Sequence, residues 1–502
     1  MNSTNVHPVF NDLQAVFKTK PNEIAIIDKD EQTYSFSDFE QYIAGAYAIL
    51  SERNIKKGDK ILVAVPMSMQ LYAILEAIFA IGATAIFLDP WMKGKKMGSI
   101  INQVQPDLFI VTKKLSRITW LLPATWKLKK WKVNKLILSN KTYPIAKIKD
   151  TDNALITFTS GTSGEPKGAN RTFAFLLAQA ETLKAHLKKS NTQSIDYTNF
   201  PIVGLANFAL GNTVAIPQLN LMKIHQSDPK EIVTQLTKQR VNRLVVSPSL
   251  LKKVLAAIGK ESSIKTILTG GAPISISLVK KALKTCPSIY FEGIYGSTEA
   301  EPICIAPFSE INKNLNQPLK GVYVGKPVAE ITIKIIKSVK KNISTATFSS
   351  LELPDNEPGE VVVTGAHVNK NYYKNKPAFE KNKIIDAEGE IWHRTGDIGY
   401  FENGFLFLVG RDHRIMTKNE KVYYPYPLEQ LLEIEFNLDD LGYIQKNNGK
   451  FYLYYYSEKN INSATIKTVI EKNNYPINEV IHLAKPLPRD ARHKSKLLVE
   501  QL

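Results

Sequence analysis

Short apolar runs alternate with longer segments of helical periodicity in this 502-residue sequence, and no other feature restricts its fold as much. Residues 23–28, 60–65 and 83–88 have the length and composition of strands. Residues 37–55 and 69–81 lie between these runs and carry apolar side chains at helical spacing. Strands that alternate with helices are typical of βαβ units and of parallel sheets. We therefore predict an α/β fold for this part of the chain.

The same alternation returns in the middle of the chain. Residues 154–158 have the pattern of a strand and residues 173–188 that of a helix. Further strands are expected at 243–246, 266–268 and 288–292. The βαβ architecture is therefore expected to continue through this region.

A different texture begins near residue 321. Short runs rich in β-branched and aromatic residues follow one another: VYVGKP, ITIKII, GEVVVTG and GFLFLVG. They predict a β-rich subdomain over about 321–411. The segment after Gly410 is small and basic, with mixed α and β patterns, and ends in a tail rich in Lys and Arg.

Cysteine content and hydropathy limit the location of the protein. Two cysteines, Cys286 and Cys304, cannot form a disulfide framework or a thiolate metal cluster, and this suits a reducing compartment. The longest apolar stretch, 71–88, is interrupted by Glu76 and favours a buried helix followed by a strand over a transmembrane helix. The first residues lack the basic and apolar parts of a signal peptide. We expect a cytoplasmic protein.

The chain carries an excess of basic residues, with 65 Lys and Arg against 47 Asp and Glu and a net charge of +18. Such an excess of positive charge can favour binding to nucleic acid, to a membrane surface or to an anionic substrate. The sequence contains no zinc-finger spacing, no RNA-recognition aromatic set and no convincing helix-turn-helix, so no nucleic acid partner is expected. The sequence does not indicate an oligomeric state.

Part of this basic excess is concentrated between Lys113 and Lys135, where eight basic residues and no acidic residue occur. Trp120, Trp126 and Trp131 lie in the same window. Basic residues interleaved with Trp suit a peripheral contact with anionic lipid. The alternative is a solvated face with the Trp side chains packed beneath it. Pro123 breaks any helical period and favours this alternative.

A loop rich in glycine and hydroxyl side chains follows the predicted strand 154–158. Backbone N–H groups in such a loop can approach an anion closely, and hydroxyls and a lysine add donors, so polyphosphate is the natural ligand. It is not a Walker A loop, because Pro166 precedes Lys167 and Gly168 follows it. A flexible linker is the alternative, but linkers rarely place Pro-Lys-Gly after a buried strand. The loop consists of Thr159, Ser160, Gly161, Thr162, Ser163, Gly164, Glu165, Pro166, Lys167 and Gly168.

This loop resembles the signature loop of the adenylate-forming superfamily, which contains acyl-CoA synthetases, adenylation domains and luciferases. Four further motifs follow in the order of that superfamily, and the resemblance extends from about residue 10 to the C-terminus. They are Thr269-Gly270-Gly271-Ala272-Pro273, Ile294-Tyr295-Gly296-Ser297-Thr298-Glu299, Gly359–Gly365 with Asn371-Tyr372-Tyr373, and His393-Arg394-Thr395-Gly396-Asp397 with Gly410-Arg411.

The resemblance implies an enzyme that uses ATP and Mg²⁺ to convert a carboxylic acid into an acyl adenylate and pyrophosphate. Catalysis would then depend on positioning and on positive charge around the phosphates. By resemblance, Thr159–Gly164 and Lys167 hold the β- and γ-phosphates, and Thr298 contacts the α-phosphate. Glu299 binds Mg²⁺.

The resemblance also assigns the adenosine end of the nucleotide. Gly271, Ala272 and Pro273 lie against the adenine, and Tyr295, followed by Gly296, stacks on it. Asp397 accepts hydrogen bonds from the ribose hydroxyls, with Arg411 close by. A turn or helix-cap role is the alternative for Asp397.

The superfamily places a catalytic lysine near its C-terminus, and the tail here offers two candidates. Lys494 is found by counting from Pro488, although His493 precedes it in place of a glycine. Lys496 is found from the pattern RHxxK that begins at Arg492, and we favour it. A solvated basic tail is the alternative for both.

In two features the sequence departs from acyl-CoA synthetases and resembles the β-lactone synthetases of bacterial olefin biosynthesis. Residues 200–211 contain no histidine, and the domain junction after Gly410 is one residue short, with Asn419 where a glycine is usual. Asn tolerates a left-handed backbone, so the turn can persist. The similar branch adenylates a long-chain β-hydroxy acid, whose hydroxyl then closes a four-membered lactone without CoA. An apolar acyl pocket is then expected along Leu205, Ala206, Asn207, Phe208 and Gly211.

Two alternatives remain. An acyl-CoA ligase would share the adenylation step and transfer the acyl group to CoA. A non-catalytic nucleotide- or lipid-binding relative would keep the fold, but Lys167 and Glu299 are both present and argue against it. By resemblance, residues 1–411 form the AMP-binding domain and residues 412–502 a mobile α+β lid, hinged near Asp412.

Overall fold

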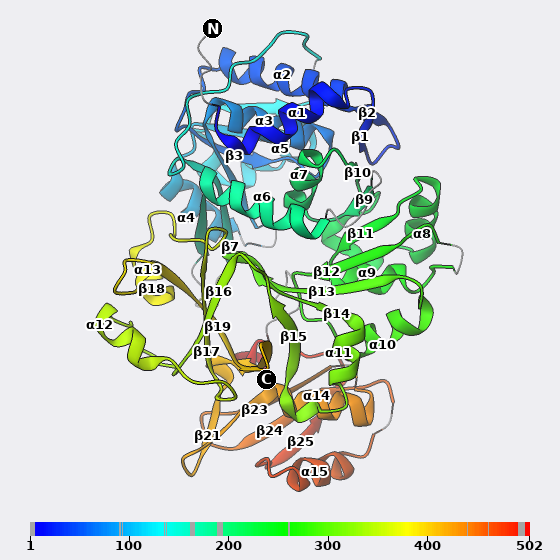
Figure 1. The fold of residues 1–502 in the computed structure, drawn as a ribbon, viewed down its shortest axis with the longest axis vertical. Helices are drawn as coiled ribbons and strands as arrows, with labels where there is room; N and C mark the ends of the chain where they lie inside the picture. The colour runs from blue at the N-terminus through cyan, green and yellow to red at the C-terminus, as the bar shows by residue number, and fades with distance from the viewer. Residues whose placement is uncertain are drawn as a thin grey trace. The chain divides into compact units, whose positions relative to one another are not determined.

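The computed structural model of the protein describes most of the chain. The described residues are 6–89, 92, 94–134, 136, 138–160, 166–187, 194–259, 262–438, 440–459, 461–489 and 497–502, without the side chains of 159 and 160. Figure 1 shows their helices and strands in chain order by colour. They form two compact units. The first contains Met1–Val246, Ala256–Lys265 and Ala366–Glu380, and the second contains Ser247–Leu255, Thr266–Gly365 and Lys381–Leu502.

The first unit contains two sets of hydrogen-bonded strands. One set has the order β6-β5-β3-β4-β7-β8, in which every pair is parallel except β7 with β8. The other has the order β11-β9-β10-β1-β2, in which only β1 with β2 is antiparallel. The strands are β1 Ile24–Ile27, β2 Thr33–Ser35, β3 Lys60–Ala64, β4 Thr84–Leu88, β5 Leu108–Thr112, β6 Lys130–Val133, β7 Asn153–Ser160, β8 Pro166–Thr172, β9 Ile195–Thr198, β10 Thr213–Ala215 and β11 Arg243–Val246.

Local sequence signals explain the helices of the first unit. Helix α2 begins at a reciprocal capping box, in which the Ser35 hydroxyl accepts from Asp38 N and the Asp38 carboxylate accepts from Ser35 N. Ser68 caps the start of α3, and Gly82 ends α3 in the left-handed conformation that glycine adopts without strain. The helices are α1 Asn11–Thr19, α2 Phe36–Glu52, α3 Met69–Ile81, α4 Gly94–Val104, α5 Lys113–Ser116, α6 Phe173–Leu187, α7 Pro201–Ala209 and α8 Pro229–Lys238, with short 3-10 helices η1 Pro8–Phe10, η2 Thr119–Leu121, η3 Pro123–Thr125 and η4 Leu221–Gln226.

The second unit is built on strands in the order β16-β17-β19-β20-β15-β14-β13-β12, with β18 paired to β19. Only β12 with β13 is parallel in this set. The strands are β12 Thr266–Gly270, β13 Tyr290–Ser297, β14 Ala300–Pro307, β15 Val322–Pro327, β16 Ile331–Ile336, β17 Gly359–Gly365, β18 Lys383–Ile385, β19 Ile391–Glu402 and β20 Phe405–Arg411. The helices of this unit before Asp412 are α9 Pro248–Val254, α10 Ile276–Thr285, α11 Phe308–Asn314, η5 Pro318–Lys320, α12 Thr345–Phe348 and η6 Ser349–Leu351. Helix α13 Lys376–Asn382 belongs to the first unit up to Glu380 and to the second from Lys381.

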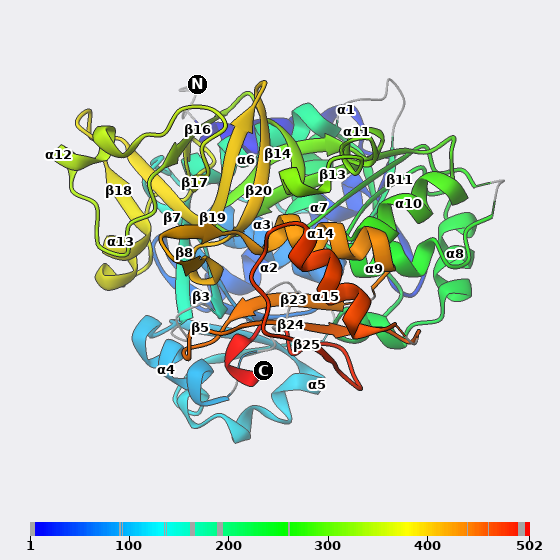
Figure 2. The ribbon, with the colours of Figure 1, turned by 90° about the horizontal axis from the view of Figure 1, so that it is seen from below.

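Residues after Arg411 form a small α+β body within the second unit (Figure 2, orange to red). A three-stranded sheet, β23-β24-β25, packs with α14 and α15 around an apolar core that includes Leu428, Tyr443 and Ile466. The elements are η7 Asp412–Arg414, β21 Met416–Lys418, β22 Lys421–Tyr423, α14 Pro425–Phe436, β23 Asp440–Gln445, β24 Phe451–Tyr456, α15 Ser463–Lys472, β25 Glu479–His482 and η8 Val499–Gln501.

The predicted α/β class and the β-rich texture after residue 321 are confirmed. Residues 71–88 form most of helix α3 followed by strand β4, as expected. Within the described residues, none of the helices combines the length and the apolarity that a membrane span requires. The predicted glycine-rich loop is shorter than expected at its C-terminal end. Residues Pro166–Thr172 pair with β7 and form strand β8.

Candidate functional site

The strands that flank the glycine-rich loop form an antiparallel hairpin in the first unit. Thr159 lies opposite Lys167, and Phe158 lies opposite Gly168. A Cβ at Gly168 would lie 2.8 Å from ring carbons of Phe158, so this position requires glycine. Residues Gly161, Thr162, Ser163 and Gly164, and the side chains of Thr159 and Ser160, lie outside the described residues. Their predicted phosphate role stays a prediction.

Lys167 is held beside a tyrosine from a distant motif. Its side chain is 8% exposed, and its Nζ atom lies 5.8 Å from the centroid of the Tyr372 ring. The Asn371-Tyr372-Tyr373 motif reaches β8 through backbone pairing, in which Ala169 bridges Tyr372 and Tyr373 N donates to Gly168 O at 2.9 Å. The two motifs are about 200 residues apart in the sequence and belong to one local structure.

Strands β12 and β13 bring two other predicted motifs together in the second unit. They are parallel neighbours, with Gly270 opposite Ile294. Strand β12 is followed directly by Gly271, Ala272 and Pro273. The C-terminal end of β13 contains Tyr295 and Gly296. Ligands of open α/β sheets bind beyond the carboxyl ends of parallel strands. The geometry therefore suits a ligand at this edge.

Two buried hydroxyl groups at this edge have no hydrogen-bond partner among the described residues. They are Thr269 Oγ1 at the end of β12 and Ser297 Oγ at the end of β13. A buried polar atom without a partner is costly, and an apolar replacement would avoid that cost. These oxygens fit a polar ligand such as a nucleotide.

Asp397 is the centre of a buried hydrogen-bonded cluster in the second unit. Tyr295 donates its hydroxyl to Asp397 Oδ2 at 2.7 Å, and Arg411 Nε lies 2.8 Å from Oδ1. Asp397 and Arg411 are directly opposite each other on β19 and β20. Asp397 N donates to Thr395 Oγ1, which itself donates to Val361 O. The structure thus unites three residues predicted for the adenosine end.

Charge and burial raise the pKa values of the residues that surround the Asp397 side chain. Burial, together with the Asp397 carboxylate, raises the pKa of the Tyr295 phenol far above its ordinary value, so the phenol remains a donor. The Asp397 carboxylate raises the pKa of the Arg411 guanidinium. Tyr426 of α14 also hydrogen-bonds Arg411, and burial raises the pKa of its phenol. No motif marks Tyr426 in the sequence, since an isolated Tyr in a helix is more often a packing residue.

Thr298 and Glu299 form the two-residue connection between β13 and β14, where Ser297 pairs with Ala300. Both are half-buried. The described residues contain no group of three His, Cys, Asp or Glu side chains that could hold a metal ion. A single carboxylate suits Mg²⁺ when phosphate oxygens and water complete its shell. Glu299 therefore fits a metal that arrives with its nucleotide.

Asp412 and Arg414 differ in how they are held at the junction. Ser338 donates to Asp412 Oδ1 at 2.5 Å. Arg414 is buried, forms an ion pair with Glu429 of α14 and donates to Tyr443 O at 3.0 Å. Arg414 thus belongs to the core of the C-terminal body. A hinge at Asp412 would lie before Arg414 in the chain, so Arg414 would move with that body.

The junction hairpin keeps the backbone that its shortened sequence predicts. Asn419 and Glu420 have φ values of 48° and 62° and connect β21 to β22, with Lys418 opposite Lys421. Positive φ at both central residues is typical of a type I′ hairpin turn, which Asn tolerates well at its first position. The expected left-handed turn is confirmed.

Lys494 and Lys496 lie outside the described residues, which end and resume on either side of them. Arg489 pairs with Asp440 at 2.6 Å, and it forms an antiparallel bridge with Leu497. Leu498 N donates to Pro488 O at 2.9 Å. The ends of the lysine-containing tail are therefore fixed to the C-terminal body.

The predicted acyl-pocket residues lie in α7 and directly after it. Ala206, Asn207 and Phe208 are buried, and Leu205 is half-buried. Phe208 packs against Phe39 and Tyr72. Their role toward a substrate stays a prediction.

A buried polar network fixes α7 in place. Arg243 pairs with the fully buried Asp196 at 2.7 Å and donates to Asn207 Oδ1 at 3.2 Å, and Asn212 donates to the same oxygen. This network therefore anchors one side of the predicted pocket segment, which ends with the buried Gly211.

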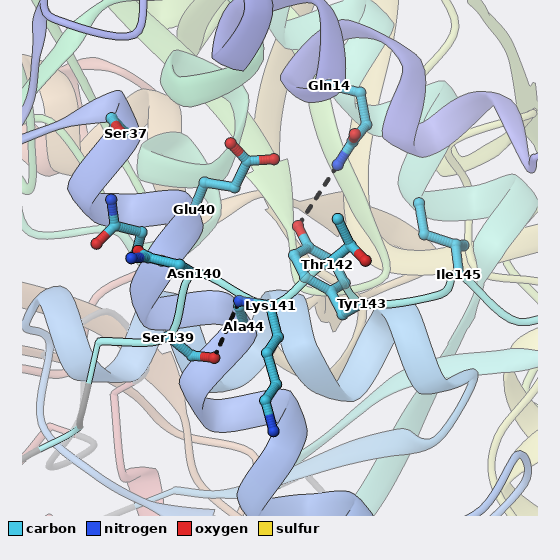
Figure 3. Close-up of a pocket in the computed structure, with 11 residues that line it drawn as sticks. Gln14, Ser37, Glu40, Ala44, Ser139, Asn140, Lys141, Thr142, Tyr143 and Ile145 are labelled. Carbon is cyan, nitrogen blue, oxygen red and sulfur yellow. Dashed lines mark hydrogen bonds between the residues drawn. The ribbon is translucent and has the colours of Figure 1, made fainter.

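A pocket of about 350 Å³ opens in the first unit between α1, α2 and residues 139–145 (Figure 3). Gln14, Glu40 and Tyr143 turn toward one another there, and Gln14 Nε2 lies 3.4 Å from the Tyr143 hydroxyl. None of the predicted site residues lines this pocket. Its lining residues are Gln14, Ser37, Glu40, Gln41, Ala44, Ser139, Asn140, Lys141, Thr142, Tyr143 and Ile145.

Comparisons with known proteins agree with the motifs. The model of the family described as AMP-binding enzyme matches residues 13–373. An olefin β-lactone synthetase of Xanthomonas campestris is 27% identical over 78% of this chain and 74% of its own length. A 2-succinylbenzoate–CoA ligase of Bacillus licheniformis is 26% identical over 97% of this chain and 98% of its own length.

The fold agrees with solved structures as well. O-succinylbenzoate coenzyme A synthetase of Bacillus subtilis, solved in complex with ATP and magnesium ion, superimposes with a TM-score of 0.79 at 20% identity. The match covers 98% of this chain and 99% of that structure. At this identity the likeness establishes the fold.

Proposed function

Because the chain belongs to the AMP-binding enzyme family and is an adenylate-forming enzyme, we propose that it activates a long-chain β-hydroxy acid with ATP and closes it to a β-lactone. The overall change is β-hydroxy acid plus ATP to β-lactone, AMP and pyrophosphate. The observation that carries the nucleotide assignment is the buried Asp397 cluster, together with the Thr269 and Ser297 hydroxyls, which lack a hydrogen-bond partner in the part of the chain that the structure describes.

Asp397 has the capacity to bind ribose while it keeps its present partners. A carboxylate offers about four lone-pair sites. Tyr295 and Arg411 occupy one on each oxygen, so two remain for the 2′- and 3′-hydroxyls. Charge-assisted hydrogen bonds of this kind are about twice as strong as neutral ones.

The first half-reaction joins the acid to the α-phosphorus. A carboxylate oxygen attacks phosphorus, and the bond to the pyrophosphate oxygen breaks. Lys167 and the glycine-rich loop hold the β- and γ-phosphates, and Lys496 or Lys494 faces the developing charge on the α-phosphate. Magnesium, held by Glu299 and phosphate oxygens, would neutralise phosphate charge.

The second half-reaction closes the ring without a second substrate. The β-hydroxyl oxygen attacks the acyl carbon, the bond from that carbon to the AMP oxygen breaks, and the hydroxyl proton is released. An intramolecular nucleophile has a high effective molarity, which offsets the strain of a four-membered ring. Similarity to an olefin β-lactone synthetase and the short Asn419–Glu420 hairpin favour this step.

Transfer to CoA is the second candidate, and one observation favours it. The similarity to a 2-succinylbenzoate–CoA ligase covers 97% of the chain, whereas that to the β-lactone synthetase covers 78%. Both candidates require ATP, Mg²⁺ and the same adenylate, and they differ only in the acceptor of the acyl group.

A product assay separates the candidates. Purified protein receives ATP, Mg²⁺ and a long-chain β-hydroxy acid, with and without CoA, and products are identified by mass spectrometry. We expect AMP and a product that lacks one water relative to the acid, in the absence of CoA. A thioester that forms only with CoA would instead establish a ligase, and the absence of any pyrophosphate release would contradict both.

A further inference from the structure

Residues 115–126, from the end of α5 toward β6, form a hydrogen-bonded surface segment in the first unit (Figure 2, cyan). The buried Thr125 hydroxyl lies 2.9 Å from the carbonyl oxygens of Thr119 and Leu122. Trp126 Nε1 donates to Trp120 O at 2.9 Å, which fixes the orientation of the Trp126 indole. We call residues 115–126 the tryptophan segment. Its conformation is set by its own hydrogen bonds.

The tryptophan segment packs inward with its small and branched side chains. A Cβ at Gly94 would lie 3.3 Å from Leu122, and a Cβ at Gly98 would lie 3.8 Å from Ala124, so this side of the segment rests on helix α4. Trp131, by contrast, lies in strand β6 and is 6% exposed within the core. The three Trp residues of this window therefore have different roles.

The outward side of the segment is apolar. Trp120 is 66% exposed and Trp126 63% exposed, although burial of such side chains in the protein would stabilise it. Leu115, Ile118 and Leu121 are also exposed. Single exposed apolar residues are ordinary, but five within twelve residues on a rigid framework indicate a contact surface.

The surroundings of these apolar side chains are strongly basic. No acidic residue occurs from Lys113 to Lys135. Amphipathic Trp rings between lysines match the boundary between acyl chains and anionic headgroups, where the ring is half-buried and the ammonium groups meet phosphate. The exposed basic side chains are Lys113, Lys114, Arg117, Lys127, Lys129 and Lys132.

We propose that the tryptophan segment and its flanking lysines dock the protein on an anionic lipid surface. The exposed Trp and Leu side chains enter the headgroup region, and the lysines bind the anionic headgroups. Nucleic acid would satisfy the lysines and leave Ile118 and Leu121 in water, so it fits the surface less well. The structure thus corrects the interpretation in which all three Trp side chains lie beneath a solvated face.

Co-sedimentation with vesicles tests this proposal independently of activity. The full chain is mixed with phosphatidylcholine vesicles that contain phosphatidylglycerol and with pure phosphatidylcholine vesicles. We expect binding to the anionic vesicles, weakened by salt. Trp120→Ala/Trp126→Ala should lower the partition coefficient at least about tenfold. Lys127→Glu/Lys129→Glu/Lys132→Glu should lower it at least about a hundredfold, since each lysine near the surface contributes roughly fivefold.

Matched control variants change the same chemistry elsewhere on the surface. Lys265→Glu/Lys281→Glu/Lys284→Glu alters net charge equally, and Met222→Ala/Ile385→Ala removes exposed apolar side chains. Both controls should bind within about threefold of the original chain. Thermal unfolding should show that all variants are folded.

Two results would overturn the proposal. One is the absence of binding by the original chain to anionic vesicles. The other is binding that responds to the lysine changes and not to the loss of Trp120 and Trp126, which would indicate unspecific attraction to any polyanion, nucleic acid included.

Discussion

The Asp397 cluster and the tryptophan segment depart from the usual distribution of polar and apolar groups in opposite directions. Asp397, Tyr295 and Arg411 are polar side chains held inside the protein, where each has a partner. Trp120 and Trp126 are apolar side chains exposed to solvent, and the Trp126 indole donates a hydrogen bond to Trp120 O. Neither arrangement is expected if the stability of the fold alone determines which side chains are buried.

The difference indicates what each region recognises. A buried carboxylate with spare lone pairs can bind a small polar ligand that enters a defined site. Exposed rings among lysines can bind only a large surface that covers all of them at once. A nucleotide suits the first region and a lipid surface the second.

The largest effect is expected from the C-terminal lysine, because it separates binding from chemistry. Lys496→Ala should lower adenylate formation by about a thousandfold or more, since a charge on the transition state is lost, while ATP still binds through the Asp397 cluster. Pyrophosphate release and nucleotide titration measure the two properties. Lys494→Ala is the matched variant. If Lys494→Ala alone abolishes the reaction, our assignment of the tail is wrong.

Asp397→Asn tests whether the buried cluster binds the nucleotide. The amide keeps the shape but loses the charge that ribose hydroxyls and Arg411 require, so kcat/KM for ATP should fall about a hundredfold. Steady-state assays of pyrophosphate release measure this change. Vesicle binding should remain unchanged, and activity within about threefold of the original enzyme would contradict a ribose role.

Glu76 sharpens the contrast with Asp397, because it is a carboxyl group in the interior of α3 whose pKa burial raises to about 7. The folded protein therefore binds this proton more tightly than the unfolded chain. The free energy of unfolding should fall by up to about 3 kcal/mol as pH rises from about 4.5 to 7, and then level off.

Urea unfolding across this pH range measures the slope, and Glu76→Gln should remove most of it. Burial also raises the pKa of Glu40, so a smaller slope should remain in the variant. Equal slopes in both proteins would show that Glu76 ionises normally in the folded state.

The smallest effect is expected from Thr269→Val and Ser297→Ala at the ends of β12 and β13. Each removes a buried hydroxyl that has no partner among the described residues, so stability should be unchanged or slightly higher, while the KM for ATP should rise about fivefold. Thermal unfolding and steady-state kinetics measure the two. A loss of stability without a change in KM would assign these oxygens a structural role.

Local signals made much of the fold predictable. Helix α3 begins and ends as predicted because Ser68 and Gly82 cap it within the sequence itself. The sequence does not predict strand β8, because Pro166 and Gly168 are poor strand residues and adopt strand conformation only through pairing with β7. Trp131 could not be told from Trp120 and Trp126, since β6 becomes a core strand only beside β5.

In the candidate site as well, the local motifs were predictable and the long-range contacts were not. The motifs around Tyr295, Asp397 and Arg411 were visible, but their union depends on contacts between residues 102 positions apart or on neighbouring strands. Their grouping was expected only from the family resemblance. Tyr372 beside Lys167 and Tyr426 beside Arg411 are long-range neighbours that no local pattern could give.

Transfer of oxygen from the acid to AMP tests the central claim most directly. The acid is labelled with ¹⁸O in its carboxyl group, incubated with the protein, ATP and Mg²⁺, and the nucleotide product is analysed by mass spectrometry. Attack of the carboxylate on the α-phosphorus predicts AMP that carries one ¹⁸O atom, because the later step breaks the bond to the acyl carbon. Unlabelled AMP, or ADP with labelled phosphate, would contradict an acyl adenylate.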